Sequence, residues 1–127
     1  MGRKEVFTRR EHMLPLRISW AIELVLQLDE NSVLDAISEL IGTEVATHEA
    51  VPAAFAIAAR WSSNPWRACL VAAQLGGDSD TIGAILGACA GKAAFPAHAL
   101  AIVTRVNGLD LTGLAKELVI IRSRVSA

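Results

Sequence analysis

The sequence predicts an all-α fold of six or seven helices. Apolar residues recur at helical spacing along most of the chain, and helix caps, glycine stops and proline starts separate these segments. Valines and isoleucines never form the sustained alternation that indicates a strand. Because 127 residues suit one domain, we expect a polar tail over residues 1–15 and a single helical domain over residues 16–127.

Two helices are expected in the first third of the chain. The first runs from about Leu16 to Leu28. The second is capped by Asn31 and Ser32 and stops at Gly42. Its expected apolar stripe is Leu34, Ile37, Leu40 and Ile41.

Two more helices follow. The segment after Glu49 carries Pro52, which a first turn tolerates, and continues almost entirely apolar to about Trp61, so we expect it to be buried. Asn64 and Pro65 then begin a helix that stops at Gly76. Its expected apolar stripe is Trp66, Cys69, Leu70 and Ala73.

The next helix is rich in small residues, with Gly83, Gly87 and Gly91 at intervals of four. Each glycine costs about 1 kcal/mol relative to alanine in a helix interior. We therefore expect close backbone packing to recover that cost. A last helix follows the turn at Asn107 and Gly108, with the stripe Leu111, Leu114, Ala115, Leu118 and Val119.

Composition and charge restrict the partners. The formal net charge is −1 and no segment concentrates Lys and Arg, so nucleic acid is not expected. The longest apolar stretch, Ile82 to Val103, is interrupted by Lys92, Pro96 and His98, so we do not expect it to span a membrane. Cys69 and Cys89 fit a reducing, cytoplasmic compartment as buried thiols. With 53% hydrophobic residues in so short a chain, we expect association, most simply as a homodimer.

Oxygen-bearing side chains cluster after the Gly76–Gly77 turn. Asp78, Asp80 and Thr81 can converge where the chain turns into a helix, and Mg²⁺ or Mn²⁺ prefers such oxygen ligands. The alternative is a helix N-terminus whose acids cap free amides and complement the helix dipole. The small-residue helix that follows favours a site over a surface cap.

These residues resemble a known family. The string Leu75-Gly76-Gly77-Asp78-Ser79-Asp80-Thr81-Ile82-Gly83-Ala84 resembles the C-terminal metal motif of the ADP-ribosylglycohydrolases, which include the dinitrogenase-reductase-activating glycohydrolases and crystallin J1 proteins. Upstream, Glu49-Ala50-Val51-Pro52-Ala53-Ala54 is similar to the family's Glu-x-Val-Pro-x-Ala helix start. The resemblance covers about Trp20 to Leu118 and implies a partial orthogonal helical bundle, the C-terminal portion of that fold.

The resemblance implies a metallohydrolase that cleaves the glycosidic bond between ADP-ribose and an acceptor such as an arginine or serine side chain. It implies two Mg²⁺ or Mn²⁺ ions, with Asp78, Asp80 and Thr81 as ligands and Asp80 bridging both. Two close ions would orient ribose hydroxyls and activate a water. Gly76 and Gly77 would let the backbone approach the ligand.

The sequence also departs from the family pattern. The upstream Thr-Asp-Asp metal motif, and the catalytic glutamate near an N-terminal Gly-Asp motif, have no counterpart, and the Asp29-Glu30 pair matches neither. The catalytic residues are therefore unassigned. Two hypotheses remain. The chain is part of a split or truncated glycohydrolase that needs a complementary N-terminal chain, or it is a non-catalytic oligomeric module that binds a divalent metal or an ADP-ribose-type ligand.

Other candidates are weaker. His48-Glu49 begins a zinc-protease signature, but Pro52 stands where its second histidine is needed. His12 and His98 are isolated. Core packing is favoured over adenine stacking for the three tryptophans, Trp20, Trp61 and Trp66.

Overall fold

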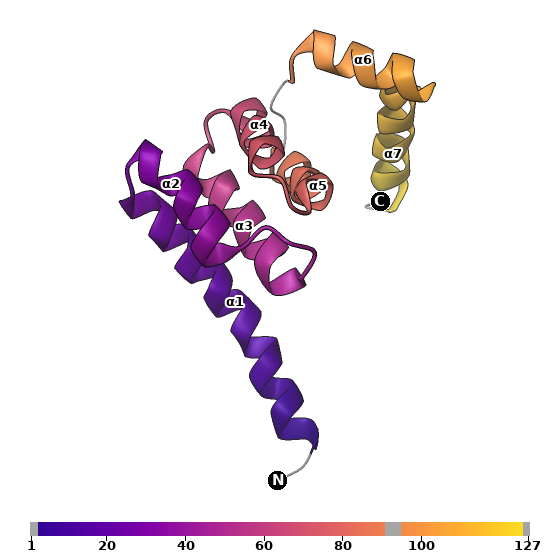
Figure 1. Cartoon of the computed structure of the whole chain (residues 1–127). Helices are drawn as coiled ribbons and strands as arrows, with labels where there is room; N and C mark the ends of the chain where they lie inside the picture. The colour runs from indigo at the N-terminus through magenta and orange to yellow at the C-terminus, as the bar shows by residue number, and fades with distance from the viewer. Residues whose placement is uncertain (1–2, 91–94, 126–127) are drawn as a thin grey trace. The chain divides into compact units, whose positions relative to one another are not determined.

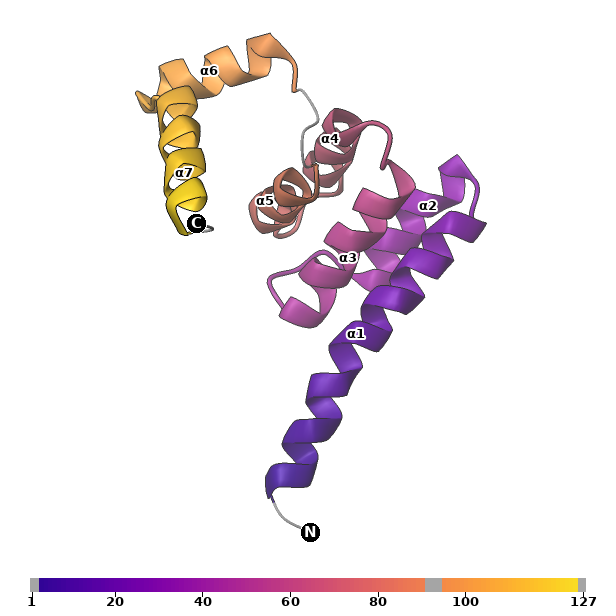
Figure 2. The same ribbon diagram turned by 180° about the vertical axis from the view of Figure 1, so that it is seen from behind.

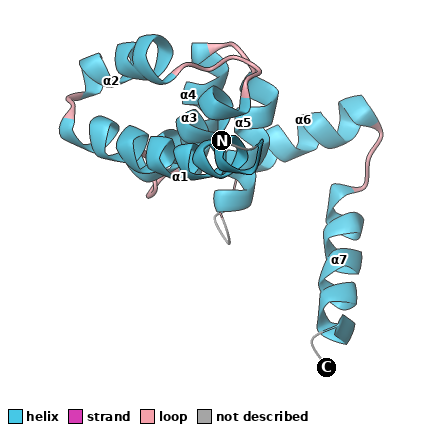
Figure 3. Ribbon diagram, turned by 90° about the horizontal axis from the view of Figure 1, so that it is seen from below, coloured by secondary structure: helices cyan, strands magenta, loops and turns pink. Residues whose placement is uncertain are grey.

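The computed structural model describes residues 3–90 and 95–125. Over this part the chain contains only helices and loops, as Figure 3 shows, which confirms the all-α prediction. The elements are α1 (Arg3–Gln27), α2 (Glu30–Ala36), the π-helix η1 (Ile37–Ile41), α3 (Thr47–Arg60), α4 (Pro65–Leu75), α5 (Ser79–Cys89), α6 (Ala97–Asn107) and α7 (Leu111–Val125). They fall into two compact units, Met1–Ala93 and Ala94–Ala127.

α1 begins well before the expected start at Leu16. It runs from Arg3 to Gln27, so residues 3–15, expected as a polar tail, are helical (Figure 1). Lys, Arg, Glu, Met and Leu dominate that segment and have high helix propensity, although the polarity of the segment as a whole suggested a tail.

Among the described residues, no helix combines the length and the apolarity needed to cross a membrane.

α2 is capped by Asp29 rather than by Asn31 and Ser32. The Asp29 Oδ1 atom accepts hydrogen bonds from the backbone N–H groups of Asn31 at 2.9 Å and Ser32 at 3.0 Å. These hydrogen bonds lower the pKa of Asp29, and the bond from Ser32 has the largest effect. Aspartate is as good a cap as asparagine or serine, and Asp29 stands two residues before Asn31.

The π-helix η1 carries the chain from α2 to Gly42. The Gly42 N–H donates to the Ile37 carbonyl at 2.9 Å, five residues back, as π-helical geometry requires. Ile37 and Ile41 are buried, whereas Leu40 of the expected stripe is 59% exposed. The wider π turn alters the helical register, and this takes Leu40 off the buried face.

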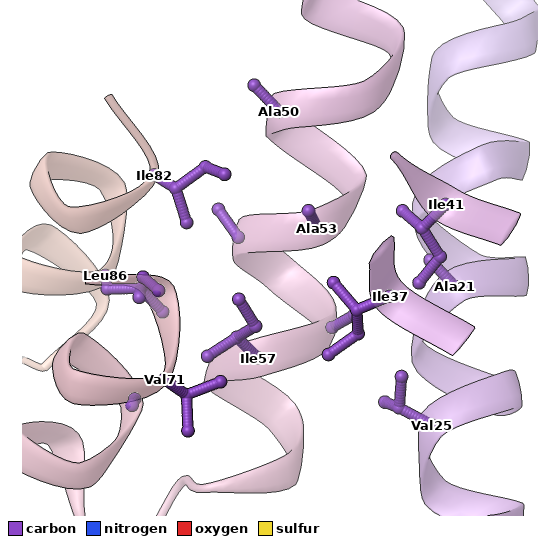
Figure 4. Close-up of a cluster of buried hydrophobic side chains, with 14 of the residues drawn as sticks. Ala21, Val25, Ile37, Ile41, Ala50, Ala53, Ile57, Val71, Ile82 and Leu86 are labelled. Carbon is purple, nitrogen blue, oxygen red and sulfur yellow. The ribbon is translucent and has the colours of Figure 1, made fainter. Parts of the chain in front are cut away.

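α3 is the centre of unit 1. It packs against α1 on one side and against α4 and α5 on the other (Figures 1 and 2). Figure 4 shows Ala53 and Ile57 of α3 between Val25 of α1 and Leu86 of α5. The predicted burial of this helix is confirmed, apart from the partly exposed Phe55. Its buried residues are Ala50, Pro52, Ala53, Ala54, Ala56 and Ile57.

α4 has the predicted bounds but buries a different face. The Asn64 side chain caps it by accepting from the Arg67 N–H at 3.0 Å. Leu70 of the expected stripe is 43% exposed. Two small alanines permit the neighbouring helices to approach more closely than a Trp or Leu face would. The residues that α4 buries are Ala68, Val71 and Ala72.

The prediction of close backbone packing at the α5 glycines is wrong for Gly83 and Gly87. A Cβ atom added at either position would meet open space. α5 contacts the core through Ile82 and Leu86, and each glycine follows one of these residues by one position, about 100° around the helix. Gly91 lies outside the described residues.

Unit 2 consists of α6 and α7. Gly108 ends α6 in the left-handed conformation, as the predicted turn at Asn107 and Gly108 requires. Neither helix has a buried residue among those described. The large exposed apolar side chains of these two helices and their connection are Leu100, Ile102, Val103, Val106, Leu109, Leu114, Leu118, Val119, Ile120, Ile121 and Val125.

We expect Gly87→Ala to raise the free energy of unfolding by about 0.5–1 kcal/mol. The added methyl group meets open space and removes the entropic cost of a helical glycine. Urea unfolding followed by circular dichroism measures the change. Ile57→Ala is the control in the same unit and should cost about 2–5 kcal/mol. A destabilised Gly87→Ala protein would mean that another surface covers this face.

Candidate functional site

The Gly-Gly-Asp-x-Asp-Thr motif forms the loop between α4 and α5 and the first turn of α5. Gly76 and Gly77 have positive φ values of 74° and 65°. Asp78 stands at the N-cap position, with Asp80 and Thr81 in the first turn. The helix dipole therefore places positive potential where the two carboxylates lie.

The three expected metal ligands interact with one another. The Thr81 hydroxyl donates to the Asp78 Oδ1 atom at 2.9 Å, and the Asp78 side chain caps no backbone amide of α5. A hydrogen bond from the Thr81 backbone N–H is the main cause that lowers the pKa of Asp80. A hydrogen bond with the Asp78 carboxyl group lowers this pKa further. Asp80 and Thr81 are exposed and Asp78 is half-buried. Asp78 therefore does not cap α5, whereas Asp80 interacts with a backbone amide of the first turn, as the capping alternative predicts.

The loop that follows η1 holds this motif from the other side. The Asp78 N–H donates to the Thr43 carbonyl at 2.7 Å. Thr43 is buried, with 6% of its surface exposed. A Cβ atom at Gly77 would collide with the Thr43 carbonyl, so only glycine permits the two loops to lie this close.

Glu49, in the first turn of α3, joins the same loop. Its Oε2 atom accepts from the Glu44 N–H at 3.2 Å. A Cβ atom at Gly42 would lie 2.6 Å from this oxygen, and Gly42 has a φ of 88°. The carboxylate of Glu49 therefore occupies the space that a side chain at position 42 would fill.

Arg17 reaches this junction from α1. Its Nε atom donates to the His48 carbonyl at 2.7 Å, and its Nη2 atom donates to the Ile41 carbonyl at 3.1 Å. The guanidinium group lies 5.7 Å from the ring centroid of Trp20. Arg17 thus ties the end of η1 and the start of α3 to α1.

A hollow of about 390 Å³ lies between these elements. Its walls come from α1, η1, the loop after it, the first turn of α3 and the α4–α5 loop. The lining residues are Arg17, Ser38, Glu39, Leu40, Ile41, Gly42, Thr43, Glu44, His48, Glu49, Leu75 and Gly77. Most of them are polar or backbone groups, so the hollow suits a hydrophilic ligand.

The described part of the chain contains no group of three or more His, Cys, Asp or Glu side chains able to hold a metal ion. Asp78 and Asp80 contribute two carboxylates to the first turn of α5, and Thr81 contributes one hydroxyl. Sequence patterns indicated Asp78, Asp80 and Thr81 but not Arg17, Thr43 and Glu44, whose hydrogen bonds hold the loop between η1 and α3 against the motif. The Glu-x-Val-Pro landmark at Glu49 was the only signal for this second group.

The other candidates pack or lie at the surface. Trp61 packs against the core and lines a pocket of about 90 Å³, whereas Trp20 is 41% exposed. His48 Nε2 lies 3.7 Å from Glu49 Oε1. Cys69 is half-buried, and burial raises the pKa of its thiol. Cys89 is exposed, so the expected burial is wrong for this residue, which ends α5 on an uncovered face.

Comparison with known proteins defines the class. A sequence profile of the family described as ADP-ribosylglycohydrolase matches residues 4–126. The chain therefore belongs to the ADP-ribosylglycohydrolase family, and the match extends beyond the expected Trp20–Leu118 at both ends.

One curated relative is the Escherichia coli K12 protein YegU, described as uncharacterized, which is 35% identical over 112 residues. The match covers 81% of this chain and 34% of YegU, so the chain spans about a third of the length of that relative. No solved structure matches.

We expect Gly77→Ala to destabilise the protein more than Gly108→Ala. Both glycines have nearly the same φ, 65° and 64°, so each alanine incurs the left-handed backbone cost of about 1–2 kcal/mol. Only Gly77 faces another segment, the carbonyl of Thr43, whereas Gly108 faces open space. Urea unfolding of the two variants measures the difference. Equal losses would contradict the close approach of the two loops.

Proposed function

We propose that this chain contributes part of the active site of a metal-dependent hydrolase that cleaves the glycosidic bond of ADP-ribosylated substrates. Family membership supports this reaction class. The observation that carries the proposal is the first turn of α5, where Asp78, Asp80 and Thr81 lie together beside a polar hollow.

The donor set fits a hard divalent cation. The Asp78 and Asp80 carboxyl groups lie within hydrogen-bonding reach of each other and repel when both are ionised, so a cation between them would relieve that repulsion. Carboxylate and hydroxyl oxygens are ligands that Mg²⁺ and Mn²⁺ prefer. A bound cation of this kind supplies Lewis-acid activation of water or of a ribose oxygen.

This chain's own residues would then hold and orient the substrate side. Gly76 presents backbone next to the two carboxylates and faces open space, which leaves room for a ribose or phosphate group. The space beside Gly77 is instead filled by the Thr43 carbonyl, so the ligand-binding role expected for Gly77 is not proposed. In the proposed hydrolysis, water oxygen bonds to the anomeric carbon, the bond to the acceptor breaks, and a proton passes to the acceptor. The acid that delivers this proton is unassigned in the chain.

We propose that the remaining ligands come from a complementary N-terminal chain, since the described residues contain no group of three or more His, Cys, Asp or Glu side chains able to hold a metal ion. The second candidate is a non-catalytic oligomeric module that binds a divalent metal or an ADP-ribose-type ligand. The exposed apolar side chains of α6 and α7 favour it. The free thiols of Cys69 and Cys89 support a cytoplasmic setting for either function.

Mn²⁺ should raise the melting temperature of the chain, and Asp80→Ala should abolish the rise. A ligand that binds only the folded state stabilises it, and Asp80 is the proposed bridging ligand. Differential scanning calorimetry at increasing Mn²⁺ measures both effects. Asp35→Ala removes an exposed aspartate on α2 and serves as the control. An unchanged metal response in Asp80→Ala would refute the ligand role.

We further propose that α6 and α7 associate with a second copy of the chain. Large apolar patches exposed in this way mark association surfaces. Sedimentation velocity should show a dimer that Val119→Asp shifts to monomer, because the substitution would bury a charge at the interface. Glu117→Gln, on the same helix, should leave the dimer intact. A monomer at every concentration up to about 100 μM would contradict this proposal.

A further inference from the structure

Glu49 and Asp78 bond to opposite ends of one peptide group. The Glu49 Oε2 atom accepts from the Glu44 N–H at 3.2 Å, and the Thr43 carbonyl accepts from the Asp78 N–H at 2.7 Å. The Thr43 carbonyl and the Glu44 N–H belong to the same peptide plane, which is rigid. Whatever fixes one end of this plane therefore fixes the other.

We propose that Glu49 is a positioning residue that sets the Asp78 loop through the Thr43–Glu44 peptide. Its carboxylate holds the N–H end of the plane, and the carbonyl end then holds the backbone of Asp78. The role assigned to Asp78 as a ligand rests on the proposed function above.

The geometry at Glu49 differs from ordinary helix capping. A glutamate at the third position of a helix commonly reaches back to the backbone N–H of the N-cap residue. Here the N-cap residue is Ala46, and the Glu49 carboxylate passes it to bond with Glu44. Stabilising α3 alone would not require this reach, whereas holding the loop does.

Both ends of this arrangement depend on a missing side chain. Gly42 leaves space for the Glu49 carboxylate, and Gly77 leaves space for the Thr43 carbonyl. Arg17 donates hydrogen bonds to the carbonyls of Ile41 and His48, which lie before and after the Thr43–Glu44 peptide in the chain. The peptide plane is therefore held at each end and anchored on either side, so it can transmit the position of Glu49 to Asp78.

Two variants of Glu49 separate the effect of its side-chain length from the effect of its negative charge. Glu49→Asp keeps the charge but withdraws the carboxylate by one methylene from the Glu44 N–H. Glu49→Gln keeps the reach and an acceptor oxygen but removes the charge. Glu39→Ala is the matched control, because Glu39 is an exposed acid lining the same hollow.

Amide hydrogen exchange without metal is the first readout. In Glu49→Asp we expect the Asp78 amide to exchange about tenfold faster while the buried core amide of Ile57 is unchanged, as local opening predicts. Glu49→Gln and Glu39→Ala should exchange like the wild type. Unchanged exchange at Asp78 in Glu49→Asp, or equal acceleration in both Glu49 variants, would overturn the proposal.

Mn²⁺ affinity by calorimetric titration is the second readout. Loss of a residue that orients a ligand costs about 10–100-fold in metal affinity, and we expect this loss in Glu49→Asp with rescue in Glu49→Gln. Wild-type affinity in Glu49→Asp would overturn the role of Glu49 in metal binding. A wild-type chain that binds no Mn²⁺ would overturn the proposed function instead, and exchange at Asp78 would then still decide whether Glu49 positions the loop.

Discussion

The close packing of α3 against the helices on its two sides is the constraint on which unit 1 depends. Four small residues of α3 are buried there, and their size lets α1 and α5 both pack closely against this one central helix. They are Ala50, Ala53, Ala54 and Ala56. Dense interiors tolerate little change in volume, so this helix fixes the positions of its neighbours. The first turn of α3 and the first turn of α5 are thereby held at one end of the same core.

The candidate site lies where loops leave that core. The Glu49 side chain, from α3, accepts from the Glu44 N–H. The Thr43 carbonyl, in the loop after the π-helix, accepts from the N–H of Asp78, which precedes α5. A π-helix commonly accompanies functional sites because it redirects the chain after it. In this protein η1 delivers Gly42 to the carboxylate of Glu49. The core thus supplies rigidity, and the loops supply the polar groups.

The polar side chains of the motif lie on a well-defined helical framework. Two carboxylates and one hydroxyl lie together, and the described residues contain no larger metal-binding group. α6 and α7 expose many large apolar side chains, and surface of this kind is ordinarily covered by another segment or by a partner.

The sequence by itself determined the all-α class, several of the helices and the motif. Local signals sufficed for the cap at Asn64, the turn at Gly108 and the cluster of Asp78, Asp80 and Thr81, because capping, turns and adjacent polar side chains depend on neighbouring residues. The α1 start was missed, since polarity was read as a tail where propensity favours a helix.

Only the tertiary structure decided which faces are buried and which distant residues serve the motif. Helical periodicity leaves alternative faces open, and packing against α3 chose Ala68 over Leu70 in α4 and turned Gly87 outward in α5. The peptide between Thr43 and Glu44 carries no sequence signal of its role. Its partners lie at other positions along the chain and come together only when the core has formed.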